Sequence, residues 1–312
     1  MQLILDAAAT AVALPYLALV DEIAAVLCDP HVVVPPRLVQ SLPGGASLFV
    51  MPAADARIAI AKLITFTPGN AQLGMPTIQG DVVIFDVASG QRIAIVDGPT
   101  ITARRTAAVS LLAAQRLARN PHGPLLIVGA GVQGRAHLEA FSTGLPLQEV
   151  WIASNPNSTK PGNSADTLAV HARQLGLRVT LVDDPNAALV HCPLVVTCTP
   201  AQQVVLHAAP RPDAFIAAVG AFTPRMVEWH ASIVQRVAHD GMLVVDSRDA
   251  DHEAGDLLQA GIDVSTMPSL ADVVDTACWR SHAAHRRDGP VFFKSCGWGG
   301  WDLAAARCII TA

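Results

Sequence analysis

The fold is decided in mid-chain by the run LLIVGAGVQG, Leu125–Gly134. Its first four residues form an apolar strand, and the pattern after the glycines, Arg135–Phe141, is typical of a helix. Glycine permits a tight turn and lets backbone N–H groups approach a pyrophosphate, which the positive end of the helix dipole favours. A dinucleotide site is therefore expected, formed by Gly129, Ala130, Gly131, Val132, Gln133 and Gly134. The alternative is an ordinary turn between a strand and a helix.

Five further strands are expected after this turn, with helical stretches between several of them. They cover Glu149–Ser154, Leu177–Val182, Leu194–Cys198, Phe215–Val219 and Met242–Asp246. Alternation of strands and helices in this way predicts a doubly wound parallel sheet.

A different pattern precedes the turn. An amphipathic helix is expected over Tyr16–Cys28, after a loop, and a longer helix over Thr100–Ala118. Between them lie short alternating segments bounded by glycine and proline, which predict a mostly antiparallel sheet: Ala46–Met51, Arg57–Thr65, Gly80–Asp86 and Gln91–Val96.

The 312 residues are enough for two domains with separate cores. The expected class is α/β, with a doubly wound Rossmann nucleotide domain (residues 119–290) inserted in an α+β domain (residues 1–118). The C-terminal segment, residues 291–312, ends in a helical stretch and is expected to return to the α+β domain.

Composition excludes several classes of function. A net charge of −5 provides no basic stripe for nucleic acid. The six cysteines form no C-x-x-C pair, which favours reduced thiols and a cytoplasmic protein. The uncharged run Ala7–Val20 follows Asp6, is interrupted by Pro15 and is too short to span a membrane. Eleven histidines without a paired spacing predict no metal site.

Three cations stand out as candidates for binding an anion. Lys62 shares a strand face with isoleucines, where a lysine is costly unless it meets an anion or reaches water at a sheet edge. Arg105 precedes small residues that allow close packing, and of two adjacent helical arginines at most one can point into a site. Arg37 follows Pro35-Pro36, which stiffens the chain. Taken singly, each arginine is better explained as a solvated surface charge.

In combination, these residues resemble the ornithine cyclodeaminase/μ-crystallin family. The resemblance runs from about Pro35 to the end of the chain. It rests on Pro36-Arg37, Lys62, Gly74-Met75-Pro76-Thr77, Arg105-Thr106-Ala107-Ala108, the glycine turn, Thr197-Cys198-Thr199-Pro200 and Lys294-Ser295-Cys296-Gly297. It implies that the α+β domain is a substrate domain and that a homodimer forms through the substrate domains of two chains. The substrate carboxylate would be surrounded by Arg37, Lys62, Thr77 and Arg105, with Lys62 and Arg105 as catalytic residues. It also implies cofactor contacts at Thr106, Thr197, Cys198, Thr199, Val219 and Ser295.

The reaction within this family is indicated by one loop. The cyclodeaminases carry a proton-handling aspartate in a Gly-Gly-Asp-type loop, and here the loop is Gly220-Ala221-Phe222-Thr223-Pro224. This loop and Gly297–Leu303 resemble the branch that reduces cyclic imino acids, the 1-pyrroline-2-carboxylate and 1-piperideine-2-carboxylate (ketimine) reductases. Phe222 and Trp298 are expected to form an apolar wall for a small ring, although either could be ordinary core packing.

The expected activity is therefore NAD(P)H-dependent reduction of a cyclic 2-imino acid to L-proline or L-pipecolate. The alternatives are an ornithine cyclodeaminase, an alanine-type dehydrogenase and a non-catalytic ligand-binding protein. The segment after the second strand carries no carboxylate that would repel a 2′-phosphate, but it has several hydroxyls, an amide and a lysine. We therefore expect NADPH to be preferred, with NADH as a possible alternative. The 2′-phosphate of NADPH is expected to be bound by Ser154, Asn155, Ser158, Thr159 and Lys160.

Overall fold

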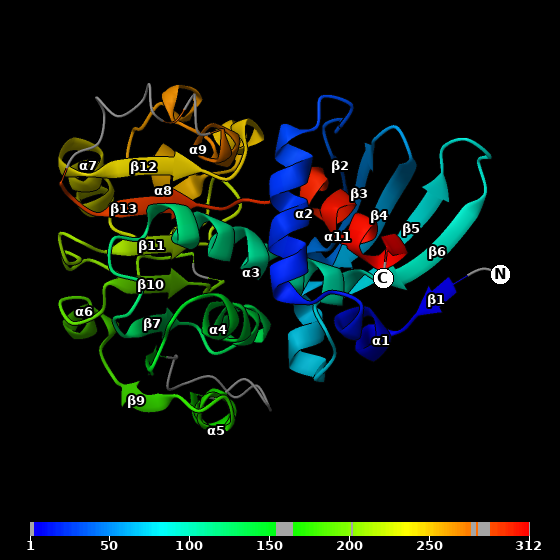
Figure 1. Ribbon diagram of the computed structural model, residues 1–312. Coiled ribbons are helices and arrows are strands. Elements are labelled where there is room, and N and C mark those ends of the chain that lie inside the picture. The colour runs from blue at the N-terminus through cyan, green and yellow to red at the C-terminus, as the bar shows by residue number, and fades with distance from the viewer. Residues whose placement is uncertain (1–2, 154–164, 201, 276–278, 280–287, 312) are drawn as a thin grey trace. The chain divides into compact units, whose positions relative to one another are not determined.

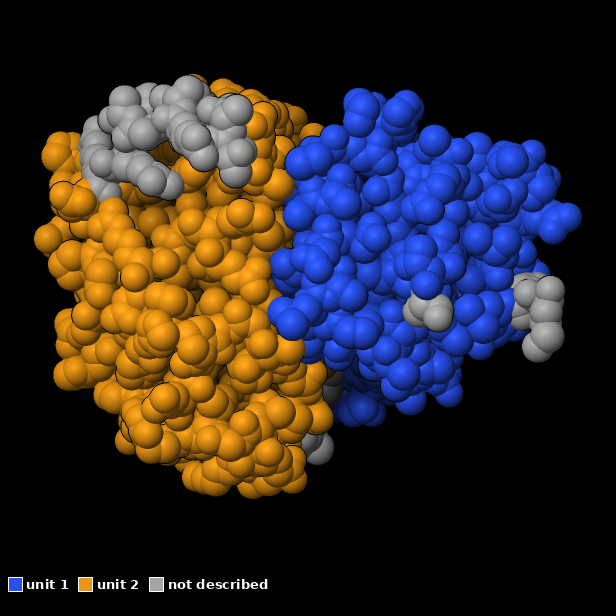
Figure 2. Space-filling model, in the orientation of Figure 1, with its two compact units in different colours: residues 1–108, 298–312 blue, residues 109–297 orange. Residues whose placement is uncertain are grey.

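The computed structural model describes residues 3–153, 165–200, 202–275, 279 and 288–311 (Figure 1). The chain forms two compact units, coloured separately in Figure 2. Unit 1 contains Met1–Ala108 and Trp298–Ala312, and unit 2 contains Val109–Gly297. Unit 2 is thus an insertion between the two segments of unit 1.

Unit 1 is built on a six-stranded sheet with the order β1-β6-β5-β4-β3-β2. β1 runs parallel to β6, and the other neighbours are antiparallel. The strands are β1 (Leu3–Leu5), β2 (Leu38–Ser41), β3 (Ser47–Ala54), β4 (Ile58–Phe66), β5 (Ile78–Asp86) and β6 (Arg92–Asp97). Four of them match the predicted segments to within three residues. β1 and β2 were not predicted, because segments of three or four residues show no measurable period.

The helices of unit 1 cover one face of this sheet. They are α1 (Ala7–Val12), α2 (Tyr16–Cys28), α3 (Gly98–Leu117) and α11 (Gly299–Thr311), with two 3₁₀ turns, η1 (Pro43–Gly45) and η2 (Pro68–Leu73). α11 packs against β3, β4 and α2 and is buried along almost its whole length. The residues before α2 form the short helix α1, begun by the Asp6 side chain, where a loop was expected. α2 has the predicted bounds.

Unit 2 is built on a seven-stranded, fully parallel sheet with the order β12-β13-β11-β10-β7-β8-β9. The strands are β7 (Leu125–Val128), β8 (Glu149–Ala153), β9 (Arg178–Val182), β10 (Leu194–Thr197), β11 (Phe215–Ala218), β12 (Met242–Val245) and β13 (Val291–Lys294). Strand order reverses between β7 and β10. In doubly wound sheets a ligand binds at such a switch point, outside the carboxyl ends of the strands.

Helices and short turns connect these strands. They are α4 (Val132–Gly144), α5 (Ala165–Gln174), α6 (Pro185–Ala188), α7 (Ala231–Asp240), η3 (Arg248–His252), α8 (Gly255–Gln259), η4 (Val264–Thr266) and α9 (Leu270–Val274). The core between sheet and helices contains Leu126, Val195, Ile216, Trp229 and Phe292.

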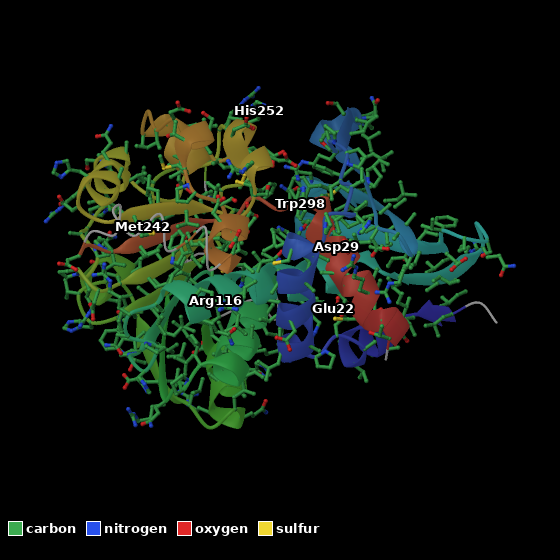
Figure 3. The ribbon with its side chains drawn as sticks, turned by 45° about the horizontal axis from the view of Figure 1, so that its top comes forward. Glu22, Asp29, Arg116, Met242, His252 and Trp298 are labelled. Atoms are coloured by element: carbon green, nitrogen blue, oxygen red, sulfur yellow. The ribbon has the colours of Figure 1, made fainter. Side chains whose placement is uncertain are left out.

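Two predicted boundaries differ from the units found. The first predicted domain ends at residue 118, but α3 is one continuous helix that passes the division after Ala108. The returning segment was expected to begin at residue 291, but Val291–Lys294 forms β13 between β11 and β12 of unit 2. This four-residue strand is buried on both faces, so it shows no alternation that would mark it as a strand. The return to unit 1 begins at Trp298, which Figure 3 labels.

Candidate functional site

The glycine turn of unit 2 divides three tasks among its glycines. Gly129 has φ +115°, and a Cβ there would lie 2.9 Å from the Cys198 carbonyl oxygen. A Cβ on Gly134 would lie 2.0 Å from the Gly129 carbonyl oxygen, so this glycine lets α4 approach the turn closely. Around Gly131 a Cβ would meet nothing within 4 Å. These are the roles of tight turn, close packing and open access to a pyrophosphate, respectively.

The start of α4 fits a bound anion. Gly131 is its N-cap and provides no side-chain hydrogen bond, so the first-turn N–H groups of the helix remain available. Val132, the first helical residue, is 65% exposed. An uncapped helix start beside an open glycine is the arrangement that a dinucleotide pyrophosphate requires. Behind the turn, the Cys198 thiol donates to the Gly129 carbonyl at 3.2 Å.

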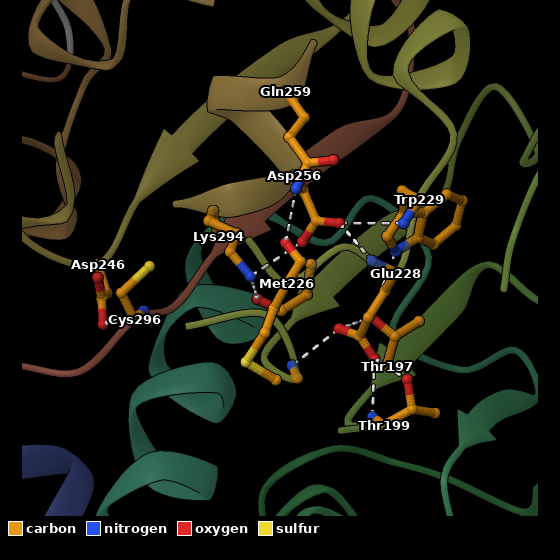
Figure 4. A network of polar contacts seen from close by, with 12 residues as sticks. Thr197, Thr199, Met226, Glu228, Trp229, Asp246, Asp256, Gln259, Lys294 and Cys296 are labelled. Carbon is orange, nitrogen blue, oxygen red and sulfur yellow. Dashed lines mark hydrogen bonds and ion pairs between the residues drawn. The ribbon is translucent and has the colours of Figure 1, made fainter. Parts of the chain in front are cut away.

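The loops after β10 and β11 are tied to one carboxylate, that of Glu228, which is fully buried (Figure 4). Its Oε1 accepts from the Thr199 backbone N–H at 2.7 Å and contacts the Thr199 hydroxyl at 2.8 Å. Its Oε2 accepts from the Gly220 N–H at 2.8 Å and from the Thr197 hydroxyl at 3.0 Å. The side-chain oxygens of Thr197 and Thr199 therefore point to Glu228. Both hydroxyls donate their proton to Glu228, so neither is left to donate to a cofactor.

Glu228 is itself held by a second buried carboxylate. Asp256 Oδ1 accepts from the backbone N–H groups of Glu228 and Trp229, at 2.7 and 3.0 Å. Lys294 lies 3.1 Å from Asp256 Oδ2 and donates to the Ala218 carbonyl (Figure 4). Burial and the charge of Asp256 raise the pKa of Glu228. Burial acts to lower the pKa of Lys294, but the charges of Asp256, Cys296 and Glu228 and the hydrogen bond to Asp256 together outweigh it, so that pKa is raised.

A third carboxylate holds the last residues of unit 2. Asp246 follows β12 and is fully buried. Its Oδ2 accepts from the Ser295 hydroxyl and from the N–H groups of Cys296 and Gly297, at 2.8–3.0 Å. The Ser295 hydroxyl, expected at the cofactor, is thus engaged with Asp246.

In unit 1 a cluster of charges lies where Lys62 was expected to need an anion. Lys62 is 1% exposed, and its cross-strand neighbours Met51 and Val82 are apolar and buried. Its Nζ lies 2.8 Å from Oδ2 of Asp302, which is fully buried in the first turn of α11. The positive end of the helix dipole favours a carboxylate there. Burial lowers the pKa of Lys62 to about 8; Asp302 limits that fall, whereas Arg105 and Arg37 add to it.

Arg105 also belongs to this cluster, whereas its neighbour Arg104 does not. Arg105 is 6% exposed, with its Nε 3.5 Å from Asp302 Oδ1. Arg104 instead donates to the Leu14 carbonyl and lies over the Tyr16 ring. As expected, only one of the two adjacent arginines points to the cluster. Arg37 lies with its guanidinium carbon 5.9 Å from the Phe49 ring centre.

The profile of the ornithine cyclodeaminase/mu-crystallin family matches residues 24–311. The chain belongs to this family. The Delta(1)-pyrroline-2-carboxylate reductase 1 of Burkholderia multivorans is 36% identical over 309 residues, which cover 97% of this chain and 94% of that protein. The same figures hold for the Delta(1)-pyrroline-2-carboxylate/Delta(1)-piperideine-2-carboxylate reductase of Azospirillum brasilense.

A solved structure of the same fold is that of Thermococcus litoralis Delta(1)-pyrroline-2-carboxylate reductase, in complex with NADH and L-proline. It superposes with a TM-score of 0.86 over 99% of this chain and 97% of that one. At 22% sequence identity, this similarity shows a shared fold and nothing more.

The remaining predicted site residues of this family member are placed as follows. Thr77 is half-buried just before β5, and its carbonyl accepts from the Thr67 N–H. In unit 1, the Trp298 ring packs edge-on against Trp301 at 4.9 Å between ring centres. The Thr106 hydroxyl donates to the Thr102 carbonyl within α3. In unit 2, Phe222 is half-buried in the loop after β11, and Val219, 8% exposed, begins that loop.

The predicted 2′-phosphate contacts lie outside the described residues. They are Ser154, Asn155, Ser158, Thr159 and Lys160.

Sequence reasoning missed the carboxylates that hold these sites. Asp302 was quoted only as part of a motif, and Glu228 and Asp256 were not considered. The signal that identified Lys62 was available for Asp302, because it is the lone charge in the apolar run Gly299–Ala306. A buried charge needs a partner of opposite sign, so a buried carboxylate predicts a cation just as a buried cation predicts a carboxylate.

Within the residues that the structure describes, no group of three or more His, Cys, Asp or Glu side chains is placed to hold a metal ion. None of the helices described is both long and apolar enough to cross a membrane.

Proposed function

We propose that this enzyme reduces the C=N bond of a cyclic 2-imino acid, 1-pyrroline-2-carboxylate or 1-piperideine-2-carboxylate, to L-proline or L-pipecolate, with NADPH preferred over NADH. The observation that carries the proposal is the buried cluster of Lys62, Arg105 and Asp302 in a chain 36% identical to reductases of these imines. The uncapped glycine turn of unit 2 supports the nicotinamide cofactor.

The charge balance of the unit 1 cluster favours an anionic substrate. Lys62, Arg105 and Arg37 bring three positive charges to one buried carboxylate, Asp302. A substrate carboxylate would compensate the excess. Arg105 would bind it through two N–H groups, and Arg37, Lys62 and Thr77 would complete the site.

Reduction of an imine requires a proton on nitrogen as well as a hydride on carbon. When bound, the reduced nicotinamide supplies the hydride, for which the imine carbon must lie about 3–3.5 Å away. Lys62 is the candidate proton donor, because a pKa of about 8 lets it give up a proton near neutral pH. Asp302 holds its Nζ in place at 2.8 Å.

Phe222 supports reduction over deamination. It occupies the loop position where the cyclodeaminases of this family carry an acid/base aspartate, and a phenyl ring exchanges no protons. Its phenyl ring would offer an apolar surface to a small ring, which an imino acid has and ornithine lacks.

The preference for NADPH rests on the segment after β8. Hydroxyls of Ser154, Ser158 and Thr159, the Asn155 amide and the Lys160 ammonium would bind a 2′-phosphate. Lys160→Ala should weaken NADPH and leave NADH nearly unchanged. Steady-state kinetics with each cofactor check this, and a wild-type kcat/KM that favours NADH would contradict it.

A homodimer is proposed from the uncovered face of the unit 1 sheet. Residues alternate along a strand, so those between the α11-facing positions share the opposite face. This open face is largely apolar and includes Val50, Leu63, Val83 and Ile95, of which Leu63 is 43% exposed. Pairing with a second copy would remove this surface from water.

We also assign the enzyme to the cytoplasm. The five cysteines that the structure describes are free thiols: Cys28, Cys192, Cys198, Cys296 and Cys308. A reducing compartment keeps thiols in this state.

One assay tests the proposed function. Oxidation of the reduced cofactor is followed with each of the two cyclic imines and with pyruvate plus ammonia, and ammonia release is followed with ornithine and NAD. We expect turnover with one or both imines. Faster turnover of pyruvate would indicate an alanine dehydrogenase, and robust ammonia release would indicate a cyclodeaminase. Saturable binding without turnover would indicate a ligand-binding protein.

A further inference from the structure

We infer that Glu228 is a positioning residue for the nicotinamide half of the cofactor site, because it joins the loops after β10 and β11 through both of its carboxylate oxygens. This inference rests on the proposed cofactor dependence. It concerns three buried charged residues, Glu228, Asp256 and Lys294, none of which takes part in the chemistry described above.

The placement follows from the sheet order. The first half of unit 2, β7-β8-β9, carries the glycine turn for the pyrophosphate and the segment after β8 for the adenosine ribose. The second mononucleotide half, β10 and β11, lies on the other side of the switch point. Its two loops, Thr197–Pro200 and Val219–Phe222, therefore belong with the nicotinamide end.

Each oxygen of Glu228 fixes one of these loops through a backbone N–H. Oε1 accepts from Thr199 and Oε2 accepts from Gly220. The Trp229 indole N–H can only donate, and it donates to the Thr197 hydroxyl at 3.3 Å. The Thr197 hydroxyl is thereby left to donate its own proton to Oε2. Oε2 thus accepts two hydrogen bonds. A donor group in its place would leave both the Gly220 N–H and the Thr197 hydroxyl without an acceptor.

The surrounding packing leaves the carboxylate no other position. A Cβ on Gly220 would lie 2.4 Å from Glu228 Oε1 and 2.1 Å from the Thr199 carbonyl oxygen, so the two loops and the carboxylate are in close contact. On the other side, Asp256 holds the backbone N–H of Glu228. Asp256 lies in the first turn of α8, whose Gly255 approaches the Met226 and Thr223 carbonyls too closely for a Cβ.

The test variant is Glu228→Gln. Glutamine keeps the size of the side chain but turns one oxygen into an NH₂ group, which would face a backbone N–H in either orientation. One loop is therefore released. The matched control is Glu149→Gln, which makes the same change at the first residue of β8, at the amino end of that strand and away from the loops that follow β10 and β11.

Binding is measured by calorimetry, without turnover, with two probes. One is the reduced cofactor that the wild type prefers. The other is ADP-ribose, or its 2′-phosphate if that cofactor is NADPH, which lacks the nicotinamide. We expect Glu228→Gln to raise the Kd of the reduced cofactor tenfold or more and to change that of the ADP-ribose probe less than twofold. Glu149→Gln should change neither.

A second variant keeps the test decisive if Glu228→Gln fails to fold. Thr199→Val removes only the hydroxyl contact to Oε1 and keeps the backbone N–H, so a two- to fivefold change with the same selectivity is expected. The inference would be overturned if Glu228→Gln and Thr199→Val weakened the binding of both probes equally, or if they changed the binding of neither probe. Failure of the wild type to bind either probe would instead overturn the proposed cofactor dependence.

Discussion

A charged side chain that leaves water must find its compensation inside the protein. Lys62 is 1% exposed, and its charge persists because Asp302 replaces the lost hydration at 2.8 Å. Replacing one partner of such a pair leaves the other buried and unpaired, which typically costs about 3–5 kcal/mol. Substitutions of Lys62 and Asp302 should therefore be conservative in shape.

Asp302→Asn tests the pairing through the pH dependence of the reaction. Burial lowers the pKa of Lys62 to about 8 and Asp302 opposes this fall, so removing the carboxylate lowers the pKa further. If Lys62 donates the proton, kcat/KM declines as the pH rises past that pKa. We expect the decline to begin at least one pH unit lower in Asp302→Asn than in the wild type. Because titration of the substrate imine is common to both enzymes, the difference reports on Lys62.

Asp86→Asn is the control for that experiment. Asp86 accepts from Ser89 in the turn between β5 and β6, and its pKa is lowered by those hydrogen bonds. Its variant should keep the wild-type pH profile. Coincident profiles for Asp302→Asn and the wild type would remove Lys62 as the proton donor.

Arg105→Ala tests the carboxylate site. We expect kcat/KM for the imine to fall by two or more orders of magnitude, equivalent to roughly 3 kcal/mol, with cofactor affinity nearly unchanged. Arg104→Ala is the matched control, since Arg104 contacts Tyr16 and Leu14 instead. An Arg105→Ala enzyme with more than about a third of wild-type kcat/KM would show that Arg105 does not bind substrate.

At the residue scale, the sequence predicts the cations of the unit 1 cluster but not the carboxylate that they contact. Lys62 was recognised because strand alternation places it among isoleucines, and Arg105 because small residues follow it. Asp302 follows both by a long stretch of chain, and no local period connects a strand to the first turn of a remote helix. The same holds for Glu228, whose partners Thr199, Gly220 and Asp256 come from three separate loops and helices.

Secondary structure elements were predicted where they are long enough to show a period. α2 has its predicted bounds, and β4, β5 and β6 differ by one or two residues at either end. α1, β1, β2 and β13 are short, and β13 is buried on both faces, so neither a helical nor a strand period could develop. The glycine turn was predicted in full because its signal is local in the sequence: Gly129 needs a positive φ, and Gly134 packs against the Gly129 carbonyl.

Two alanine substitutions separate the roles of those glycines. In Gly131→Ala the new Cβ meets no protein atom within 4 Å, so the melting temperature should hold while the Kd of the cofactor rises at least tenfold. In Gly134→Ala the Cβ would lie 2.0 Å from the Gly129 carbonyl oxygen, and we expect a clear loss of thermal stability. Calorimetric melting and titration of both variants check this. Equal melting temperatures for the two would contradict the assignment.

On the scale of the whole molecule, the open face of the unit 1 sheet determines the expected assembly. Leu63→Lys places a charge on that face, and we expect sedimentation to show a shift from dimer to monomer at micromolar concentration. Val170→Lys is the control, because Val170 is 53% exposed on α5 of unit 2. A wild-type chain that sediments as a monomer would rule out the proposed dimer.

The insertion of unit 2 between the two segments of unit 1 has a consequence for the order in which the chain folds during synthesis. Every strand of unit 2 has been translated before α11 emerges from the ribosome, because α11 follows Gly297. The parallel sheet can therefore form first. Until α11 is made, the unit 1 sheet lacks the helix that packs on β3 and β4, and Lys62 lacks its carboxylate. Nascent chains arrested before α11 should thus protect unit 2 from protease while unit 1 is still cleaved.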